Sequence, residues 1–106
     1  VYNAVDSGDL GKLTVLLEKR EDKNPVIYID NLGNGWTVLH LSAFWDIVDI
    51  IRGYYEDLHF EDINRLDSSG NLTPMSLAAQ AGQLNVVKYI VSVQGGYKVL
   101  IKFLIT

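Results

Sequence analysis

The sequence predicts an all-α fold in which antiparallel pairs of helices stack side by side. Three observations predict it. Residues that start and stop helices occupy equivalent places in successive segments, apolar residues recur at helical spacing, and the whole pattern occurs three times. The chain has 106 residues, of which 48% are hydrophobic and 21% charged, which suits one domain, or a fragment of one, with a buried core.

The clearest helix pair is expected between residues 73 and 91. Thr73 suits the N-cap of a first helix, and Pro74 suits the first helical position, where a missing N–H costs nothing. Gly82 suits the left-handed residue that ends this helix. A second helix is expected over residues 83–91, because apolar residues recur there at helical spacing, namely Leu84, Val87, Ile90 and Val91.

The same template fits two upstream segments. In the middle copy, residues 37–43 form the first helix and Asp46 takes the turn, followed by the apolar positions Val48, Ile51, Tyr54 and Tyr55. In the first copy, Ala4 and Val5 end a truncated first helix and Gly8 makes the turn, followed by the apolar positions Leu10, Leu13, Leu16 and Leu17. The turn positions are 38 residues apart (8 to 46) and then 36 apart (46 to 82), which indicates a repeat.

The residues of the first helices identify a family that the chain resembles. Thr37-Val38-Leu39-His40-Leu41-Ser42-Ala43 and Thr73-Pro74-Met75-Ser76-Leu77-Ala78-Ala79 resemble the T-P-L-H-x-A signature of ankyrin repeats. Asp67-Ser68-Ser69-Gly70 resembles the hairpin tip of that family, and Ile63-Asn64 resembles the valine-asparagine that precedes it. The resemblance covers residues 1–94 and implies an ankyrin-repeat solenoid with hairpin-like finger loops.

We expect a single ankyrin-repeat domain or fragment of about three repeats. Repeat 1 spans residues 1–29 and is truncated at its start, repeat 2 spans 30–66, and repeat 3 spans 67–94. Residues 95–106 are expected to form a partial repeat or a C-terminal capping helix, since Gly96 precedes a helical stripe; a β-strand over 98–105 is the alternative. Because repeats need neighbours to bury their faces, we expect the native chain to continue beyond at least one end.

Several residues depart from the family pattern. The spacing exceeds 33 residues, with extra length in residues 19–29, in residues 56–63 and at Leu72. Val38 replaces the proline of the signature, Ser76 replaces its histidine and Asp46 replaces the glycine of the turn. Gly53 lies inside a second helix, where glycine is expected to cost roughly 0.5–1 kcal/mol relative to alanine. The repeats are therefore diverged.

The sequence predicts no enzyme. A catalytic site needs a nucleophile, a base and a group that orients the base. His40 lies in the signature segment, where the resemblance implies a structural role in bridging hairpin loops by hydrogen bonds. Ser42 is two residues away and therefore on another helix face. No phosphate-binding loop, no H-E-x-x-H, no G-x-S-x-G and no Rossmann fingerprint occurs.

The sequence also predicts no cofactor, no metal and no nucleic acid. Asp57, His59 and Glu61 alternate along one segment and could hold a divalent metal, but a solvated acidic loop is the preferred interpretation. The absence of cysteine excludes disulfides and thiolate metal sites, and the formal charge of −4 disfavours phosphate binding. The apolar stretch 99–105 is far shorter than the ~20 residues of a membrane helix.

The resemblance implies that partners bind at the finger tips and at the exposed ends of the first helices. The matching positions in repeats 2 and 3 are Asn34, Trp36, Phe44, Trp45, Ser68, Ser69, Asn71 and Gln80. Three of them are large aromatic residues, a type that commonly anchors protein interfaces. The alternative is that Trp36, Phe44 and Trp45 pack beneath the long insertions.

These observations favour a non-enzymatic protein–protein interaction module that docks a partner protein or peptide on its concave finger and first-helix surface. Two alternatives stay open: a regulatory or positioning segment of a larger enzyme or channel, and an architectural spacer. Exposed aromatic residues would favour recognition, and aromatic residues buried by the chain's own loops would favour architecture. We expect an intracellular location, in the cytoplasm, the nucleus or the host cytosol of an intracellular bacterium or parasite.

Overall fold

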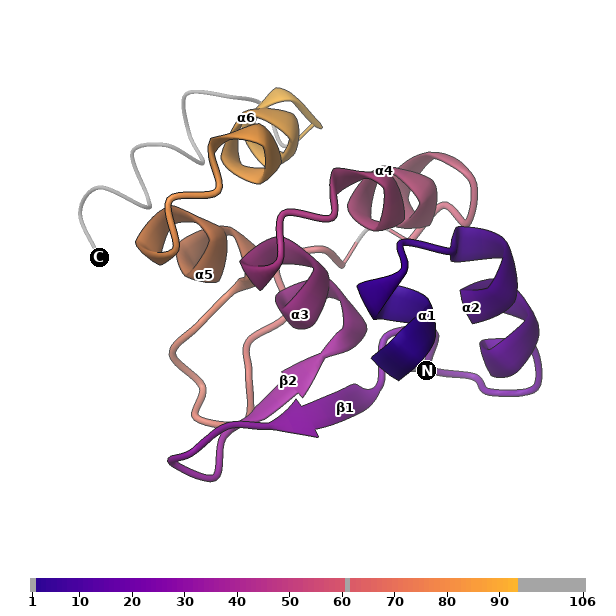
Figure 1. Ribbon diagram of the computed structural model, residues 1–106, viewed down its shortest axis with the longest axis horizontal. Coiled ribbons are helices and arrows are strands. Elements are labelled where there is room, and N and C mark those ends of the chain that lie inside the picture. The colour runs from indigo at the N-terminus through magenta and orange to yellow at the C-terminus, as the bar shows by residue number, and fades with distance from the viewer. Residues whose placement is uncertain (1, 61, 94–106) are drawn as a thin grey trace.

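The computed structural model describes residues 2–60 and 62–93 of the chain (Figure 1). This part contains six helices and a sheet of two strands. In chain order the elements are α1 (Tyr2–Asp6), α2 (Leu10–Leu17), β1 (Val26–Ile29), β2 (Gly35–Thr37), α3 (Val38–Phe44), α4 (Val48–Glu56), α5 (Pro74–Gln80) and α6 (Leu84–Val93).

The helices form three pairs that stack in two layers. The first helices α1, α3 and α5 lie in one layer, in which α3 packs between α1 and α5. The second helices α2, α4 and α6 lie in the other layer, in which α4 packs between α2 and α6 (Figure 1). Each pair therefore contacts its neighbours along the stack, as the repeated sequence pattern predicts.

Both complete first helices start with the caps that their sequences predict. The Thr37 side chain accepts a hydrogen bond from the backbone N–H of His40, and the Thr73 side chain accepts one from the backbone N–H of Ser76. In each case the third helical residue bonds back to the cap, which completes a capping box.

The three turns between paired helices share one backbone conformation. The φ angles of Gly8, Asp46 and Gly82 are 69°, 61° and 74°, all in the left-handed region. Asp46 therefore adopts the conformation predicted for it from the position of the family's turn glycine. A short polar side chain tolerates this region better than most others, at some conformational cost.

The prediction of an all-α fold is wrong in one region. Residues 26–37 form a two-stranded antiparallel sheet, in which Val26 faces Thr37, Tyr28 faces Trp36 and Ile29 faces Gly35, with an irregularity between Val26 and Tyr28. The first strand, Val26–Ile29, consists of β-branched and aromatic residues, which favour extended backbone. Part of the extra length predicted in residues 19–29 is therefore a strand.

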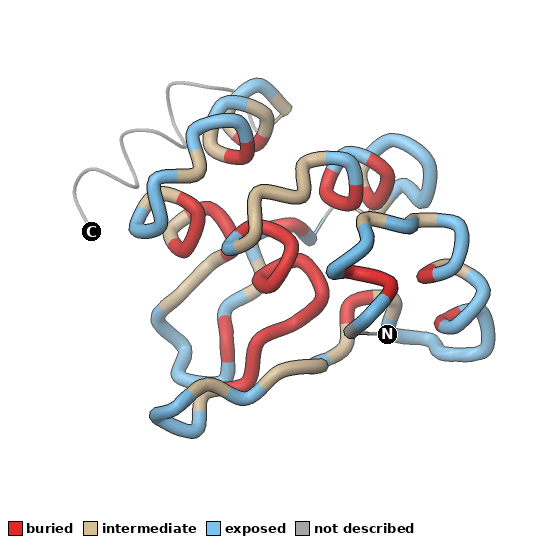
Figure 2. The backbone as a smooth tube through the Cα atoms, in the orientation of Figure 1, coloured by how far each residue is buried: buried red, intermediate tan, exposed pale blue. Residues whose placement is uncertain are grey.

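The core lies between the two helix layers and is densest at α3 and β2 (Figure 2). Six consecutive residues of α3, Val38 to Ala43, are buried. The stripes predicted for the outer helices are partly wrong, because Leu16 is 47% exposed and Leu84 is 65% exposed. In α6 the predicted position Ile90 is buried, and the other buried position is Val86, which the predicted stripe omitted.

Gly53 is explained by the close approach of α2 to α4. A Cβ atom at Gly53 would lie 2.1 Å from Cδ2 of Leu10 and 3.1 Å from its Cγ. Gly53 itself is buried. The expected cost of a helical glycine is thus offset by tight packing of two neighbouring second helices. The capping helix or strand predicted for residues 95–106 lies outside the described residues.

Candidate functional site

The middle finger is the hairpin formed by β1, β2 and the turn between them. The Asp30 side chain closes this turn, because its Oδ1 accepts hydrogen bonds from the backbone N–H of Leu32 at 2.9 Å and of Asn34 at 2.8 Å. Gly33 supplies a φ angle of 84°. Leu32 is 87% exposed at the tip, whereas the predicted contact residue Asn34 is half-buried.

The third finger is a turn built around the buried Asp67. Its Oδ1 accepts hydrogen bonds from Ser69 Oγ at 2.5 Å and from the backbone N–H groups of Asn71 at 3.3 Å and Leu72 at 3.2 Å. Burial alone would raise the pKa of Asp67, but these hydrogen bonds hold it below its ordinary value. The carboxylate fixes the finger, while Ser68, Ser69 and Asn71 are exposed on it.

The two fingers touch through Ser68. The backbone N–H of Ser68 donates to the Gly35 carbonyl at 3.0 Å, and the Ser68 Oγ accepts a hydrogen bond from the Gly35 N–H. Gly35 lies close to β1, since a Cβ there would be 2.9 Å from Cγ1 of Val26. The predicted contact residue Ser68 therefore also joins one finger to the next.

His40 ties the middle helix pair to the third finger, which confirms its predicted structural role. Its Nε2 donates to the Leu72 carbonyl at 2.8 Å. Its Nδ1 lies 2.7 Å from Thr37 Oγ1 and accepts from the Thr37 N–H at 3.2 Å. These partners define a neutral ring with the proton on Nε2. Burial lowers the pKa of His40, despite a smaller opposing effect of the Leu72 carbonyl.

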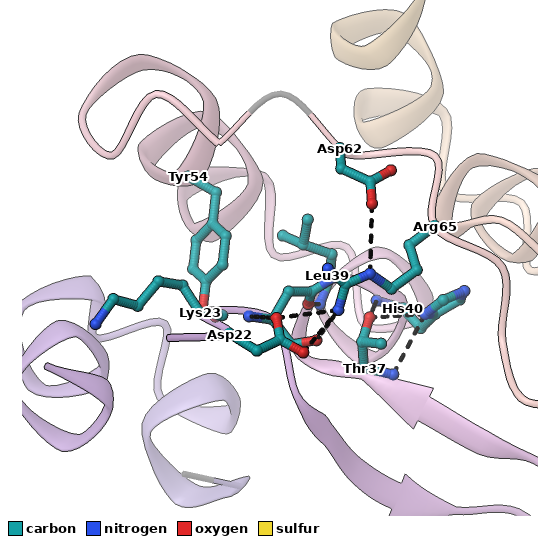
Figure 3. A network of polar contacts seen from close by, with 9 residues as sticks. Asp22, Lys23, Thr37, Leu39, His40, Tyr54, Asp62 and Arg65 are labelled. Atoms are coloured by element: carbon teal, nitrogen blue, oxygen red, sulfur yellow. Dashed lines mark hydrogen bonds and ion pairs between the residues drawn. The ribbon is translucent and has the colours of Figure 1, made fainter. Parts of the chain in front are cut away.

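A second polar network fastens the connection between α2 and β1 (Figure 3). Asn24 is fully buried, and its Oδ1 accepts from the Leu39 N–H at 2.9 Å. Arg65 Nη1 donates to Asp22 at 2.9 Å and to the Asn24 carbonyl at 2.9 Å. The Tyr54 hydroxyl donates to the Lys23 carbonyl at 2.5 Å. Burial raises the pKa of Tyr54, with the Asp22 charge acting in the same direction.

The three predicted aromatic contact residues differ in exposure. Trp36 is only 8% exposed, and its ring lies 5.3 Å from the Tyr28 ring and 5.2 Å from the Phe44 ring. Phe44 is 40% exposed at the end of α3, and the half-buried Trp45 packs against the core. The buried position of Trp36 matches the architectural alternative, whereas the exposed ring of Phe44 matches recognition.

The end of α5 lies beside this aromatic row. Gln80, its last residue, is exposed, and Gln83 in the following turn donates from Nε2 to the Phe44 carbonyl at 2.9 Å. The structure thus brings Trp36 and Phe44 into contact and places the third helix pair next to them. Sequence analysis missed Tyr28, although the β-branched and aromatic run of residues 26–29 is a signal for the strand that presents it.

We use the name finger surface for the eight predicted contact residues, which are Asn34, Trp36, Phe44, Trp45, Ser68, Ser69, Asn71 and Gln80. A hollow of about 370 Å³ lies at the turn that follows Trp45 in the chain. It is formed by the turns of the first two helix pairs, and its lining residues are Asp6, Ser7, Gly8, Asp46, Ile47, Val48 and Asp49. Three carboxylates therefore border one hollow.

Neither a cluster suited to a metal ion nor a helix suited to spanning a membrane occurs in the described residues. No three His, Cys, Asp or Glu side chains of residues 2–60 and 62–93 form a group that could hold a metal ion. Glu61, one of the three residues considered for a metal, lies outside the described residues. Within the same ranges, none of the helices has the length and apolar character needed to cross a bilayer.

The geometry defines a class of protein: a helical repeat protein with stacked helix pairs, capping boxes on the first helices and hairpin fingers joined across repeats. Comparison with protein families matches residues 1–103 to the family described as ankyrin repeats, in three copies. The chain belongs to the ankyrin repeat family. Comparisons with curated proteins and with solved structures returned no match.

Proposed function

We propose that this chain is a non-enzymatic recognition module that docks a partner protein or peptide on the finger surface. Ankyrin repeats are generally protein–protein interaction modules, which supports the proposal that the chain binds another protein. We locate the contacts on the finger surface chiefly because of Phe44. This residue is 40% exposed at the end of an otherwise buried helix, and Gln83 of the neighbouring helix pair bonds to its carbonyl.

The surroundings of Phe44 resemble the layout of a protein interface. Such an interface has an aromatic centre surrounded by polar groups that pair with the partner. Here the centre is Phe44 with the half-buried Trp45, and Gln83 is a polar neighbour that bonds to the Phe44 carbonyl. Gln80 on α5 and Asn71 on the third finger add exposed polar groups to the finger surface. Helices and capped turns hold these side chains, so little conformational entropy is lost on binding.

Trp36 has a supporting role in this proposal. Its ring lies between Tyr28 of β1 and Phe44 of α3, so it fixes the orientation of the exposed phenylalanine ring. Because Trp36 is 8% exposed, we assign it little direct contact with a partner. A variant at Trp36 would mix loss of folding with loss of binding. Phe44 is therefore the better position for a test.

The test is affinity capture from a cell lysate with the parent chain, Phe44→Ala and the control Leu84→Ala. Leu84 is 65% exposed on α6, on the second-helix layer, so its truncation removes comparable apolar surface away from the finger surface. We expect a partner that the parent and Leu84→Ala retain and that Phe44→Ala loses. Interface aromatic residues of this kind contribute about 2 kcal/mol or more, equivalent to a roughly thirtyfold loss of affinity.

Circular dichroism and thermal unfolding of all three proteins show whether Phe44→Ala remains folded. A folded Phe44→Ala variant that captures the same proteins as the parent contradicts the proposed location of the site. Loss of capture by Leu84→Ala alone would move the site to the second-helix layer. Neither result requires the partner to be known in advance.

A further inference from the structure

No lysine or arginine lies in the fingers, in the first helices or in the turns between paired helices. The chain has nine lysine and arginine residues, and none of them falls in residues 1–11, 24–51 or 66–87. These ranges contain α1, α3 and α5, both strands, the third finger and all three turns between paired helices. Two of the nine, Lys98 and Lys102, lie outside the described residues.

The seven described basic residues all belong to second helices or to the connections that follow them. Lys12, Arg52 and Lys88 lie on α2, α4 and α6. Lys19, Arg20, Lys23 and Arg65 lie in the connections that lead from a second helix to the next finger. Three of the seven side chains are already engaged, since Arg65 pairs with Asp22 and Asp62, Arg52 pairs with Asp49, and Lys23 Nζ donates to the Leu17 and Glu18 carbonyls.

Acidic residues, in contrast, do occur in these segments, and three of them line the hollow between the first two turns. Asp6, Asp46 and Asp49 line this hollow, and the lining includes no basic side chain. Within the described part of the chain, the buried Oδ1 of Asp46 has no hydrogen-bond partner. Asp49 pairs with Arg52 at 2.9 Å, but both side chains are exposed, so a competing cation can replace this pair.

The hollow and the aromatic residues of the finger surface are neighbours in the chain. Asp46 directly follows Trp45, and Phe44 precedes them both. Cationic side chains are attracted to the faces of aromatic rings as well as to carboxylates. The segments that form the finger surface and the hollow therefore carry aromatic rings and negative charge, and none of them contains a lysine or arginine.

We propose that the occupant of the finger surface is a basic protein segment, rich in lysine or arginine. Its cationic side chains enter the hollow lined by Asp6, Asp46 and Asp49, and its apolar groups contact Phe44 and Trp45. This inference deepens the recognition function proposed above and rests on it. Charge complementarity of this kind selects partners by sign and repels acidic proteins from the same surface.

The test uses a defined probe, a short synthetic peptide of alternating arginine and leucine, and a matched peptide of alternating glutamate and leucine. Amide chemical shifts of the labelled chain are followed by NMR as each peptide is added. We expect the arginine peptide to shift the amides of Gly8, Phe44 and Asp46, with an affinity that falls as salt is added. The glutamate peptide leaves those amides in place.

Two charge variants sharpen the test. Asp6→Asn/Asp46→Asn/Asp49→Asn removes three negative charges from the hollow while preserving side-chain shape. Glu56→Gln/Asp57→Asn/Asp62→Asn removes three from the end of α4 and the connection after it. We expect the first variant to weaken binding of the arginine peptide about tenfold and the second less than twofold. The difference is large because three ion pairs of modest individual strength act together.

The inference is overturned if the glutamate peptide binds equally well, if the arginine peptide shifts only residues 56–62, if no shift occurs, or if both charge variants bind alike. Repeating the lysate capture with the hollow variant separates the two proposals. A partner that depends on Phe44 but ignores the loss of the three carboxylates leaves the recognition function standing and rejects the basic partner. A capture that ignores Phe44 contradicts the recognition surface itself.

Discussion

The middle and third helix pairs are built on the same plan, 36 residues apart, yet they differ at the third residue of the first helix. Thr37 and Thr73 cap α3 and α5 in the same way, and the partner residues in the capping boxes are His40 and Ser76. The Ser76 hydroxyl bonds only within its own helix start, to the Thr73 carbonyl at 2.9 Å and the Thr73 N–H at 2.8 Å.

His40 completes the capping box of its helix in the same way, and it also bonds to the next repeat. While its Nδ1 serves the Thr37 cap, its Nε2 reaches the Leu72 carbonyl at 2.8 Å, in the finger of the next repeat. The comparison separates two tasks. Capping a helix needs only a short polar side chain, whereas joining two repeats needs a side chain long enough to bond at both ends.

Further differences follow the same alignment. Asp46 corresponds to Gly82, Gly53 to Tyr89 and Phe44 to Gln80. Tyr89 is half-buried, with the Arg52 guanidinium 5.4 Å from its ring centroid, whereas Gly53 makes room for Leu10. The middle pair is thus fitted to neighbours on both sides. Exchanging residues between the pairs tests which differences matter.

The largest effect is expected from His40→Ser, which gives the middle pair the residue of the third. The serine can keep the capping box, but the Leu72 carbonyl keeps only the Asp67 N–H as a donor, and a cavity replaces the buried ring. We expect the free energy of unfolding to fall by about 3 kcal/mol, measured by urea denaturation. Ser76→Ala serves as control and should cost about 1 kcal/mol. Equal losses in the two variants would contradict the bridging role.

The pH dependence of stability provides a second readout for the same variant. Because burial holds the pKa of His40 below its ordinary value of 6.5, the unfolded chain binds this proton more readily than the folded chain. The contribution of neutral His40 to the stability of the fold is therefore complete above pH 6.5, and it is lost as the pH falls through the lower pKa of the folded state. Between the two pKa values, the free energy of unfolding changes by at most about 1.4 kcal/mol per pH unit because of this one group. His40→Ser removes this part of the slope.

An intermediate effect is expected from Gly53→Ala. A new methyl group would lie 2.1 Å from Cδ2 of Leu10, so α2 and α4 must separate or the leucine must change rotamer. Overpacking of this kind outweighs the higher helix propensity of alanine, and we expect a net loss of about 1 kcal/mol in thermal or urea unfolding. In a Leu10→Ala background the same change should become stabilising. A stabilising effect in the parent chain would contradict the close approach of these helices.

The smallest effect is expected from Asp46→Gly, which gives the middle turn the residue of the other two. The φ angle of Asp46 is 61°, and glycine adopts this conformation without steric cost. We expect a gain in stability of about 0.5 kcal/mol, after the greater freedom of the unfolded glycine is subtracted. Asp49→Gly, two residues into α4, should instead be destabilising. A loss at Asp46 would show that its side chain stabilises the turn.

Local signals in the sequence were sufficient for most of the fold. Threonine caps, left-handed turn residues and apolar spacing act over a few residues, so Thr37, Thr73 and Gly82 could be placed without knowledge of the tertiary structure. The strand Val26–Ile29 was missed because residues 19–29 were interpreted as an insertion, and Asn34 and Trp36 as positions on a finger loop. Leu16 and Leu84 were misplaced because periodicity gives a stripe but not which neighbour covers it.

The candidate site was harder to predict because exposure depends on contacts between distant segments. Trp36, Phe44 and Trp45 were grouped by their place in the repeat, yet only the hairpin contact with Tyr28 decides that Trp36 is buried. The hollow at Asp6 and Asp46 joins residues 40 positions apart and carries no local signature. The absence of basic residues was visible in the sequence, but its meaning required knowledge of which segments share a face.

The burial of α3 has a consequence for local opening of the chain, which hydrogen exchange can measure. Six consecutive residues, from Val38 to Ala43, are buried, and α3 lies between α1 and α5. Its backbone amides exchange hydrogen with solvent only when a neighbouring pair detaches, whereas among the described residues α1 and α6 each contact one helix of their own layer and open more readily. Hydrogen exchange should therefore be slower in α3 than in α1 and α6.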